Sequence, residues 1–273
     1  VRQRASMRTK LVVGNWKMHK TLAEAVATVE ASLRWVDARK DVDVAICPPF
    51  TALSKVRELL RNTHIQVGAQ DVFWKDAGAF TGQISPAMLS DIGCAYCIVG
   101  HSETRGRFGK LEIAESSLNY FAESDHTINL KIRALLYQSI NPILCVGETE
   151  AERQAGQTEA VIRNQLAAAL EGIDPSEMYF FSVAYEPVWA IGTGNTCDSA
   201  EANRVCGFIR QVISDLNDPD VAQNIRILYG GSVKPENADD LFRQPEIDGG
   251  LVGGASLDPD SFSRIVMAAG SNA

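Results

Sequence analysis

Short runs of apolar residues alternate along this chain with longer segments in which apolar residues recur every three or four positions. The short runs are typical of buried strands, and the longer period is typical of amphipathic helices. The pattern predicts strands at residues 10–14, 42–47, 65–69, 96–100, 142–146, 180–184, 225–229 and 250–252. It predicts helices between them, including 21–34, 124–138, 161–170 and a last one that begins at Pro259.

Strict alternation of strands and helices implies an α/β fold with parallel strands. Eight such units over roughly 250 residues suit a single closed (β/α)8 barrel. The alternative is an open doubly wound sheet, but no Gly-x-Gly-x-x-Gly follows the first strand. We therefore expect one barrel domain over residues 7–273. We expect residues 1–6 to be a disordered N-terminal extension, with Met7 as the true start.

The composition of the 273 residues is ordinary for a globular protein, with 45% apolar and 22% charged residues. No apolar run approaches the ~18 residues of a membrane span, so we expect no membrane partner. The net charge of −8 argues against a nucleic-acid partner, and it means that an anionic substrate needs local positive charge or backbone N–H groups. Cys94 and Cys97 have a C-x-x-C spacing, but the pair runs into a predicted strand and no second pair follows, so we interpret them as structural.

In a barrel of this type, chemistry takes place at the carboxyl ends of the strands. Polar residues and glycines follow five of the predicted strands. They are Asn15 and Lys17, His101 and Glu103, Glu186, Gly230 to Ser232, and Gly253 with Gly254. The two late glycine pairs expose backbone N–H groups that can surround a phosphate. Taken singly, His101 can be a structural histidine and Lys17 a surface lysine.

Glu186 ends an apolar strand and precedes a segment that resembles a lid. Pro187 and the Gly192-Thr193-Gly194 sequence bracket four apolar residues that need a surface to close upon. A carboxylate shielded from water by such a lid is a stronger base. The alternative is a capping acid before an ordinary turn. A base, an imidazole and an ammonium facing a phosphate site suit proton abstraction beside a carbonyl.

Several long strings resemble the triosephosphate isomerase family in the family's order. They are GNWKM at 14–18, VGHSE at 99–103, CVGE at 145–148, AYEPVWAIGTG at 184–194, YGGSVKP at 229–235 and LVGGASL at 251–257. The resemblance covers residues 10–266. It implies that the chain interconverts dihydroxyacetone phosphate and glyceraldehyde 3-phosphate, a small phosphorylated triose, through an enediolate. It also implies a homodimer formed through the loop at 70–85, a cytoplasmic location, and no cofactor or metal.

The resemblance implies a role for each matching residue. Glu186 is the base, His101 is a neutral electrophile, and Glu103 supports the site from behind. Lys17 and Asn15 bind substrate and stabilise charge. The residues that hold the phosphate are Gly192, Ser232, Gly253 and Gly254. Two other functions stay open at this point: a catalytically impaired barrel that serves as a binding scaffold, and a different barrel isomerase of phosphorylated sugars, against which the lid argues.

The chain departs from the family pattern after the fourth strand. Gln83 and Thr104 stand where the family commonly has an ion pair near its dimer interface. About thirteen extra residues lie within 106–120. Leu111, Ala114 and Leu118 there have helical spacing, so we predict a short amphipathic helix that covers this surface as a dimer contact. The alternative is a tolerated loop, because lengthening a loop costs little entropy.

Overall fold

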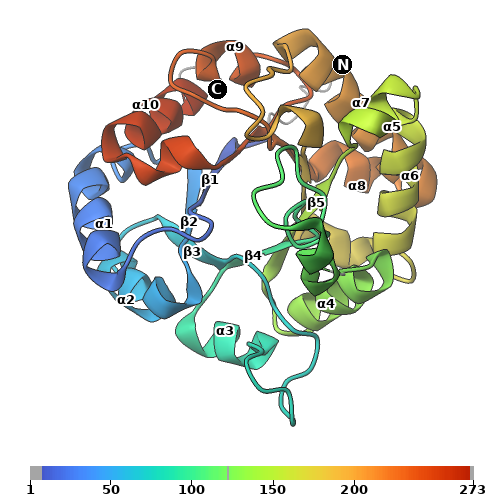
Figure 1. Cartoon of the computed structure of the whole chain (residues 1–273). Coiled ribbons are helices and arrows are strands. Elements are labelled where there is room, and N and C mark those ends of the chain that lie inside the picture. Colours follow the sequence, from blue (N-terminus) through green and yellow to red (C-terminus); the bar gives the residue numbers. More distant parts are fainter. Residues whose placement is uncertain (1–7, 122, 271–273) are drawn as a thin grey trace.

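Eight parallel strands close into a barrel surrounded by helices in the computed structural model, which describes residues 8–121 and 123–270 (Figure 1). Each strand pairs with the next, and β8 pairs with β1. The strands are β1 Leu11–Asn15, β2 Asp43–Cys47, β3 Gln66–Ala69, β4 Tyr96–Val99, β5 Asn141–Val146, β6 Ser182–Tyr185, β7 Arg226–Tyr229 and β8 Gly249–Val252. The predicted barrel is confirmed, and the predicted strand ends differ by only one or two residues. The predicted extension at 1–6 lies outside the described residues.

Helices connect the strands on the outside of the barrel. The α-helices are α1 Leu22–Val36, α2 Phe50–Leu60, α3 Pro86–Ile92, α4 Asp125–Tyr137, α5 Glu150–Gln154, α6 Thr158–Ala169, α7 Ser199–Leu216, α8 Pro219–Asn224, α9 Ala238–Phe242 and α10 Pro259–Gly270. The 3₁₀ helices are η1 Glu115–Phe121, η2 Pro175–Phe180, η3 Val188–Ala190 and η4 Gly254–Leu257. Within the described part of the chain, no helix is both long and apolar enough to cross a membrane.

The core has two layers, because alternate residues of each strand point to opposite sides of the barrel wall. In β1, Leu11 and Val13 belong to the cluster inside the barrel, whereas Val12 packs outward against the helices. Ile98 and Cys145 fill the inside from β4 and β5 in the same way. The filled interior makes the barrel a rigid support for the side chains at its rim.

Local signals explain where the helices begin. Thr21 and Glu24 form a capping box at the start of α1, in which the side chain of each residue accepts the backbone N–H of the other. The Asp198 carboxylate accepts the Glu201 N–H and begins α7. Pro259 opens α10 as predicted. These caps fix the lengths of the loops that carry the site.

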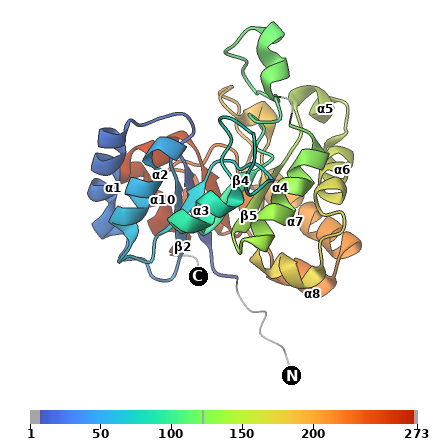
Figure 2. The ribbon, with the colours of Figure 1, turned by 90° about the horizontal axis from the view of Figure 1, so that it is seen from below.

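The segment at 106–120 differs from its prediction. It forms one 3₁₀ helix, η1, at its end, and no residue of η1 is buried. Leu111 and Ala114 precede η1 and are exposed, so the predicted amphipathic helix over 111–118 is wrong. Figure 2 shows this green segment rising from the carboxyl ends of the strands. The helical spacing misled because a single turn without a packing surface gains too little to form an α-helix.

A buried ionic cluster ties α7 to the amino ends of the late strands. The Arg210 guanidinium is 2.7 Å from the carboxylates of both Asp248 and Glu246, and it donates to the carbonyl of Ile225. Asp248 also accepts the backbone N–H of Ile227 at 2.9 Å. Both Arg210 and Asp248 are at least 95% buried, and Asp248 also pairs with Arg8 at 2.7 Å, so the members of the cluster compensate one another's charges.

We expect Asp248→Ala to lower the free energy of unfolding by about 3 kcal/mol, because it leaves the buried Arg210 charge with one fewer partner. Urea titration followed by circular dichroism measures the loss. Glu58→Ala removes one member of the exposed Lys55–Glu58 pair and serves as the control, with a change below about 0.5 kcal/mol. A loss under about 1 kcal/mol in Asp248→Ala contradicts the assigned role of the cluster.

Candidate active site

Four of the predicted residues form a continuous chain of contacts at the carboxyl ends of β1, β4 and β6. Lys17 Nζ lies 2.6 Å from Glu103 Oε1. The Glu103 backbone N–H donates to His101 Nδ1 at 3.2 Å. His101 Nε2 lies 2.7 Å from Glu186 Oε1. The structure therefore brings an ammonium, an imidazole and a carboxylate into one site, although they lie up to 169 residues apart in sequence.

The hydrogen bond at Nδ1 fixes the tautomer of His101. A proton on Nδ1 would face the Glu103 N–H, so we assign the single ring hydrogen to Nε2, directed at Glu186. Burial lowers the pKa of His101, but the carboxylates of Glu186 and Glu103 raise it more, so the pKa lies above its ordinary value. The largest part of this rise comes from the Glu186 contact, and it disappears when that carboxylate moves away.

Glu186 is buried, and both of its carboxylate oxygens have partners. Oε2 accepts the Ser102 backbone N–H at 2.9 Å, and Oε1 faces His101. Burial raises the pKa of Glu186, but the His101 ring and the hydrogen bonds from His101 and Ser102 lower it more. Burial therefore acts in the predicted direction, but in this arrangement the contacts with His101 and Ser102 outweigh it, and the pKa of Glu186 lies below the ordinary value.

Lys17 has a strained backbone that its neighbours hold in place. Its φ of 52° lies in the left-handed region, which is costly for a residue with a Cβ. The Asn15 side chain accepts the Lys17 backbone N–H at 3.0 Å. The Gln70 amide donates to the Lys17 and Cys47 carbonyls, both at 2.9 Å. These three bonds point the Lys17 side chain toward Glu103 and the interior of the site.

The lid, residues 188–193, begins with η3 and is held at its base by Glu148. The fully buried Glu148 accepts the indole N–H of Trp189 at 2.9 Å and the hydroxyl of Tyr185 at 3.1 Å. The Arg153 guanidinium lies 4.1 Å from the centre of the Trp189 ring. Burial raises the pKa of Glu148 despite these hydrogen bonds. The tip of the lid is exposed, and a Cβ built on Gly192 would meet nothing within 4 Å, so the lid is raised.

The predicted phosphate residues are only partly brought together. A Cβ built on Gly253 would lie 3.5 Å from Lys17 Cε, so the end of β8 borders the ammonium. Gly254 follows at the start of η4, and it also has open space around it. Ser232 is half-buried after β7, where its carbonyl accepts the Asn237 amide at 2.9 Å. Gly192 stands apart from them on the raised lid.

The structure shows contacts that the sequence reading missed. Ser102 supplies the N–H that holds Glu186, Glu148 holds the lid, and Gln70 holds Lys17. Gln70 follows β3, and Glu148 lies two residues beyond β5. Reading the ends of those two strands by the same rule as the others would have found both.

The match to known proteins agrees with this geometry. The family model described as triosephosphate isomerase matches residues 10–269. The chain belongs to the triosephosphate isomerase family. Proteins named triosephosphate isomerase from Roseiflexus sp. (strain RS-1) and Dictyoglomus thermophilum are 52% and 46% identical to it, each over 95% of this chain and over 97% and 99% of their own lengths. One from Synechococcus sp. (strain RCC307) is 50% identical over 94% of this chain and 93% of its own.

Membership of the triosephosphate isomerase family confirms the resemblance drawn from the six sequence strings. All six strings lie within residues 10–269. They end six of the eight strands or form the loops after them, which is where a barrel places its chemistry.

We expect Gln70→Leu to lower kcat/KM at least about tenfold. The strained Lys17 backbone then loses the amide that ties its carbonyl to the Cys47 carbonyl. Steady-state kinetics with a triose phosphate measure the change. Gln66→Leu, at the exposed start of the same strand, is the matched control and should stay within about twofold. Equal activity of the two variants would show that Lys17 keeps its position without Gln70.

Proposed function

We propose that this protein interconverts dihydroxyacetone phosphate and glyceraldehyde 3-phosphate by proton transfer through an enediolate. The observation that carries this proposal is the buried Glu186 carboxylate, 2.7 Å from the His101 imidazole in a site that Lys17 borders, in a chain of the triosephosphate isomerase family. A carboxylate, an N–H donor and an ammonium are the groups that this reaction needs. The reaction needs no oxidant or reductant, since one carbon loses the proton that the other gains.

In the forward direction, Glu186 removes a proton from C1 of the ketone, and the bonding electrons move to the C2 oxygen. His101 Nε2–H and the Lys17 ammonium stabilise that oxygen, with Asn15 placing the Lys17 backbone. A proton also passes from the C1 hydroxyl to the C2 oxygen through His101 Nε2. Glu186 returns its proton to C2, and the C1–O bond becomes the aldehyde. Glu103 is a positioning residue, because it contacts both Lys17 and His101 from behind.

Closing the lid adjusts Glu186 for this task. To reach a substrate carbon, the carboxylate leaves the Ser102 N–H and the His101 ring, which are the contacts that lower its pKa. The burial that raises the pKa remains, and the lid excludes more water. The carboxylate therefore becomes a stronger base as the site closes, and the imidazole is freed to face the substrate oxygen.

Backbone N–H groups hold the phosphate in this proposal, because the net charge of −8 on the chain opposes a bound anion. Gly253 borders Lys17 just after β8, Gly254 follows it, and Ser232 follows β7. Gly192 joins them when the lid comes down. Within the described residues, nothing favours the alternative of an impaired barrel that only binds partners.

We expect Glu186→Asp to lower kcat by about 10²-fold with the fold intact, since the shorter side chain withdraws the carboxylate by about 1 Å. A coupled assay that follows glyceraldehyde 3-phosphate measures the rate. Glu171→Asp, at an exposed position after α6, is the control and leaves kcat unchanged. If Glu186→Asp keeps kcat within about threefold, another group is the base.

A homodimer formed through the loop at 70–85 is part of this proposal. All residues of 75–83 are exposed, and Figure 1 shows the segment projecting outward beyond α3. Phe73 stacks on Trp74 and packs against Phe80, which stiffens the loop. Met18, next to Lys17, is 94% exposed and offers a second apolar contact near the site. A stiff projecting loop with aromatic residues suits docking onto a second copy.

We expect Phe80→Asp to shift the protein from dimer toward monomer, because it places a charge in an apolar contact. Sedimentation equilibrium measures the mass in solution. Leu216→Asp changes a side chain with the same 43% exposure at the end of α7, far along the chain from the loop, and should leave the mass unchanged. A parent that is monomeric, or a Phe80→Asp variant as dimeric as the parent, removes this contact from the proposal.

Two further parts of the proposal concern the whole chain. We place the enzyme in the cytoplasm, which suits six cysteines that are all free and buried. We take residues 7–273 as one barrel domain with an insertion within 106–120 and residues 1–6 as an extension of it. The parallel closed sheet and its continuous outer core support the single domain.

A further inference from the structure

The insertion after β4 forms a tongue, which we define as residues 106–121. Its two ends meet at the base, where a Cβ built on Gly106 would lie 2.9 Å from the Phe121 carbonyl oxygen. Phe108 packs edge-on against Phe121, with ring centres 5.4 Å apart. The Arg107 backbone N–H donates to the Ser102 carbonyl at 2.8 Å. The base of the tongue is thus closed and fixed to the segment that carries His101.

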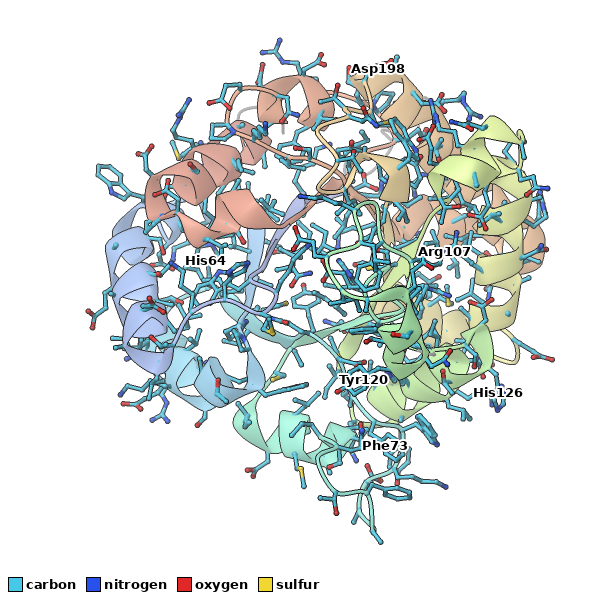
Figure 3. The ribbon with its side chains drawn as sticks, in the orientation of Figure 1. His64, Phe73, Arg107, Tyr120, His126 and Asp198 are labelled. Atoms are coloured by element: carbon cyan, nitrogen blue, oxygen red, sulfur yellow. The ribbon has the colours of Figure 1, made fainter. Side chains whose placement is uncertain are left out.

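Arg107 attaches the tongue to the loop after β5 and to α5. Its guanidinium donates to the Gly147 carbonyl at 3.2 Å and forms an ion pair with Glu152. The Glu152 carboxylate is itself held, because it accepts the Thr149 N–H at the start of α5. In Figure 3, Arg107 lies within the ring of helices, on the side of α5 and α6. This anchor lies only two residues before Gly109.

Gly109 brings the backbone of the tongue directly against the lid. A Cβ built on Gly109 would lie 2.3 Å from the carbonyl oxygens of both Val188 and Ile191, and 3.1 Å from Thr193 Cγ2. The φ of Gly109 is not positive, so its backbone conformation does not require glycine. Glycine is required here because a side chain would have no room. Any side chain at this position would displace the lid or the tongue.

The contact belongs to the raised position of the lid. In that position the Trp189 indole N–H donates to Glu148, and a Cβ built on Gly192 at the exposed tip would meet nothing within 4 Å. Closing moves the lid toward the phosphate residues, whereas the base of the tongue stays fixed by Arg107 and Phe108. The Gly109 contact is therefore lost on closing, and it stabilises the raised state relative to the closed one.

We propose that Gly109 is a positioning residue for the catalytic lid, and that the tongue is a dock that holds the lid raised between turnovers. The part concerning turnover rests on the proposed function, whereas the contact itself does not. Loss of the dock frees the lid and lowers the cost of closing. A ligand that requires the closed lid then binds more tightly and leaves more slowly.

Gly109→Ala tests the dock, because its added methyl overlaps the two lid carbonyls without straining φ. In the ligand-free protein, we expect amide hydrogen exchange in residues 188–195 to rise about threefold or more. We expect the Kd and the dissociation rate of 2-phosphoglycolate, whose carboxylate resembles the enediolate, to fall by about the same factor. Ser116→Ala, on the exposed face of η1, is the matched control and changes neither quantity.

Phe108→Ala loosens the base of the tongue without touching the lid and should shift both quantities in the same direction as Gly109→Ala. Thermal melting confirms that each variant is folded. Unchanged lid exchange in Gly109→Ala, or weaker binding of 2-phosphoglycolate, overturns the proposal. If the parent protein neither binds 2-phosphoglycolate nor isomerises triose phosphates, the proposed function fails. Amide hydrogen exchange in residues 188–195 then decides by itself whether the tongue holds the lid.

Discussion

The buried contact between Glu186 and the segment after β4 is the constraint on which the site depends. A carboxylate with no more than 2% exposure needs partners, and it finds them in the His101 ring and the Ser102 N–H. Close packing of β5, β6 and β7 brings them within reach. A Cβ on Gly147 would lie 1.7 Å from the Glu186 carbonyl oxygen, and one on Gly230 would lie 3.0 Å from its Cγ. Glycines at both positions let the strand ends meet.

The same contact lowers the pKa of Glu186, because the His101 ring and the Ser102 N–H satisfy its charge. In the proposed mechanism, the basicity of Glu186 rises when it exchanges those partners for a substrate under a closed lid. The strain at Lys17 is a parallel case, because Gln70 and Asn15 hold a backbone that costs about 1–3 kcal/mol. Both groups are placed in advance by bonds that do not involve the substrate.

The barrel and most of the site followed from local patterns in the sequence. Apolar periodicity predicted each strand, because a parallel strand buried on both faces reads as a short apolar run. The rule that chemistry sits at strand ends located Lys17, His101 and Glu186. The direction of the Glu186 pKa did not follow, because it depends on a contact across 84 residues. Gln70 does lie at a strand end, but its bond to the Lys17 carbonyl joins residues 53 positions apart, so local patterns do not reveal its partner.

Local sequence patterns did not predict the shape of the tongue either. The length of the tongue also explains little of its proposed effect on the lid. A longer loop costs only about 0.6 kcal/mol for each doubling of its length, so the extra residues cost the fold little. The position of the tongue is fixed at its amino-terminal end, where Arg107 is anchored two residues before Gly109. Its partners there, Gly147 and Glu152, flank Glu148, which holds the lid through Trp189. The tongue and the lid are thus both attached to the region from Gly147 to Glu152, and this shared support sets the distance between them.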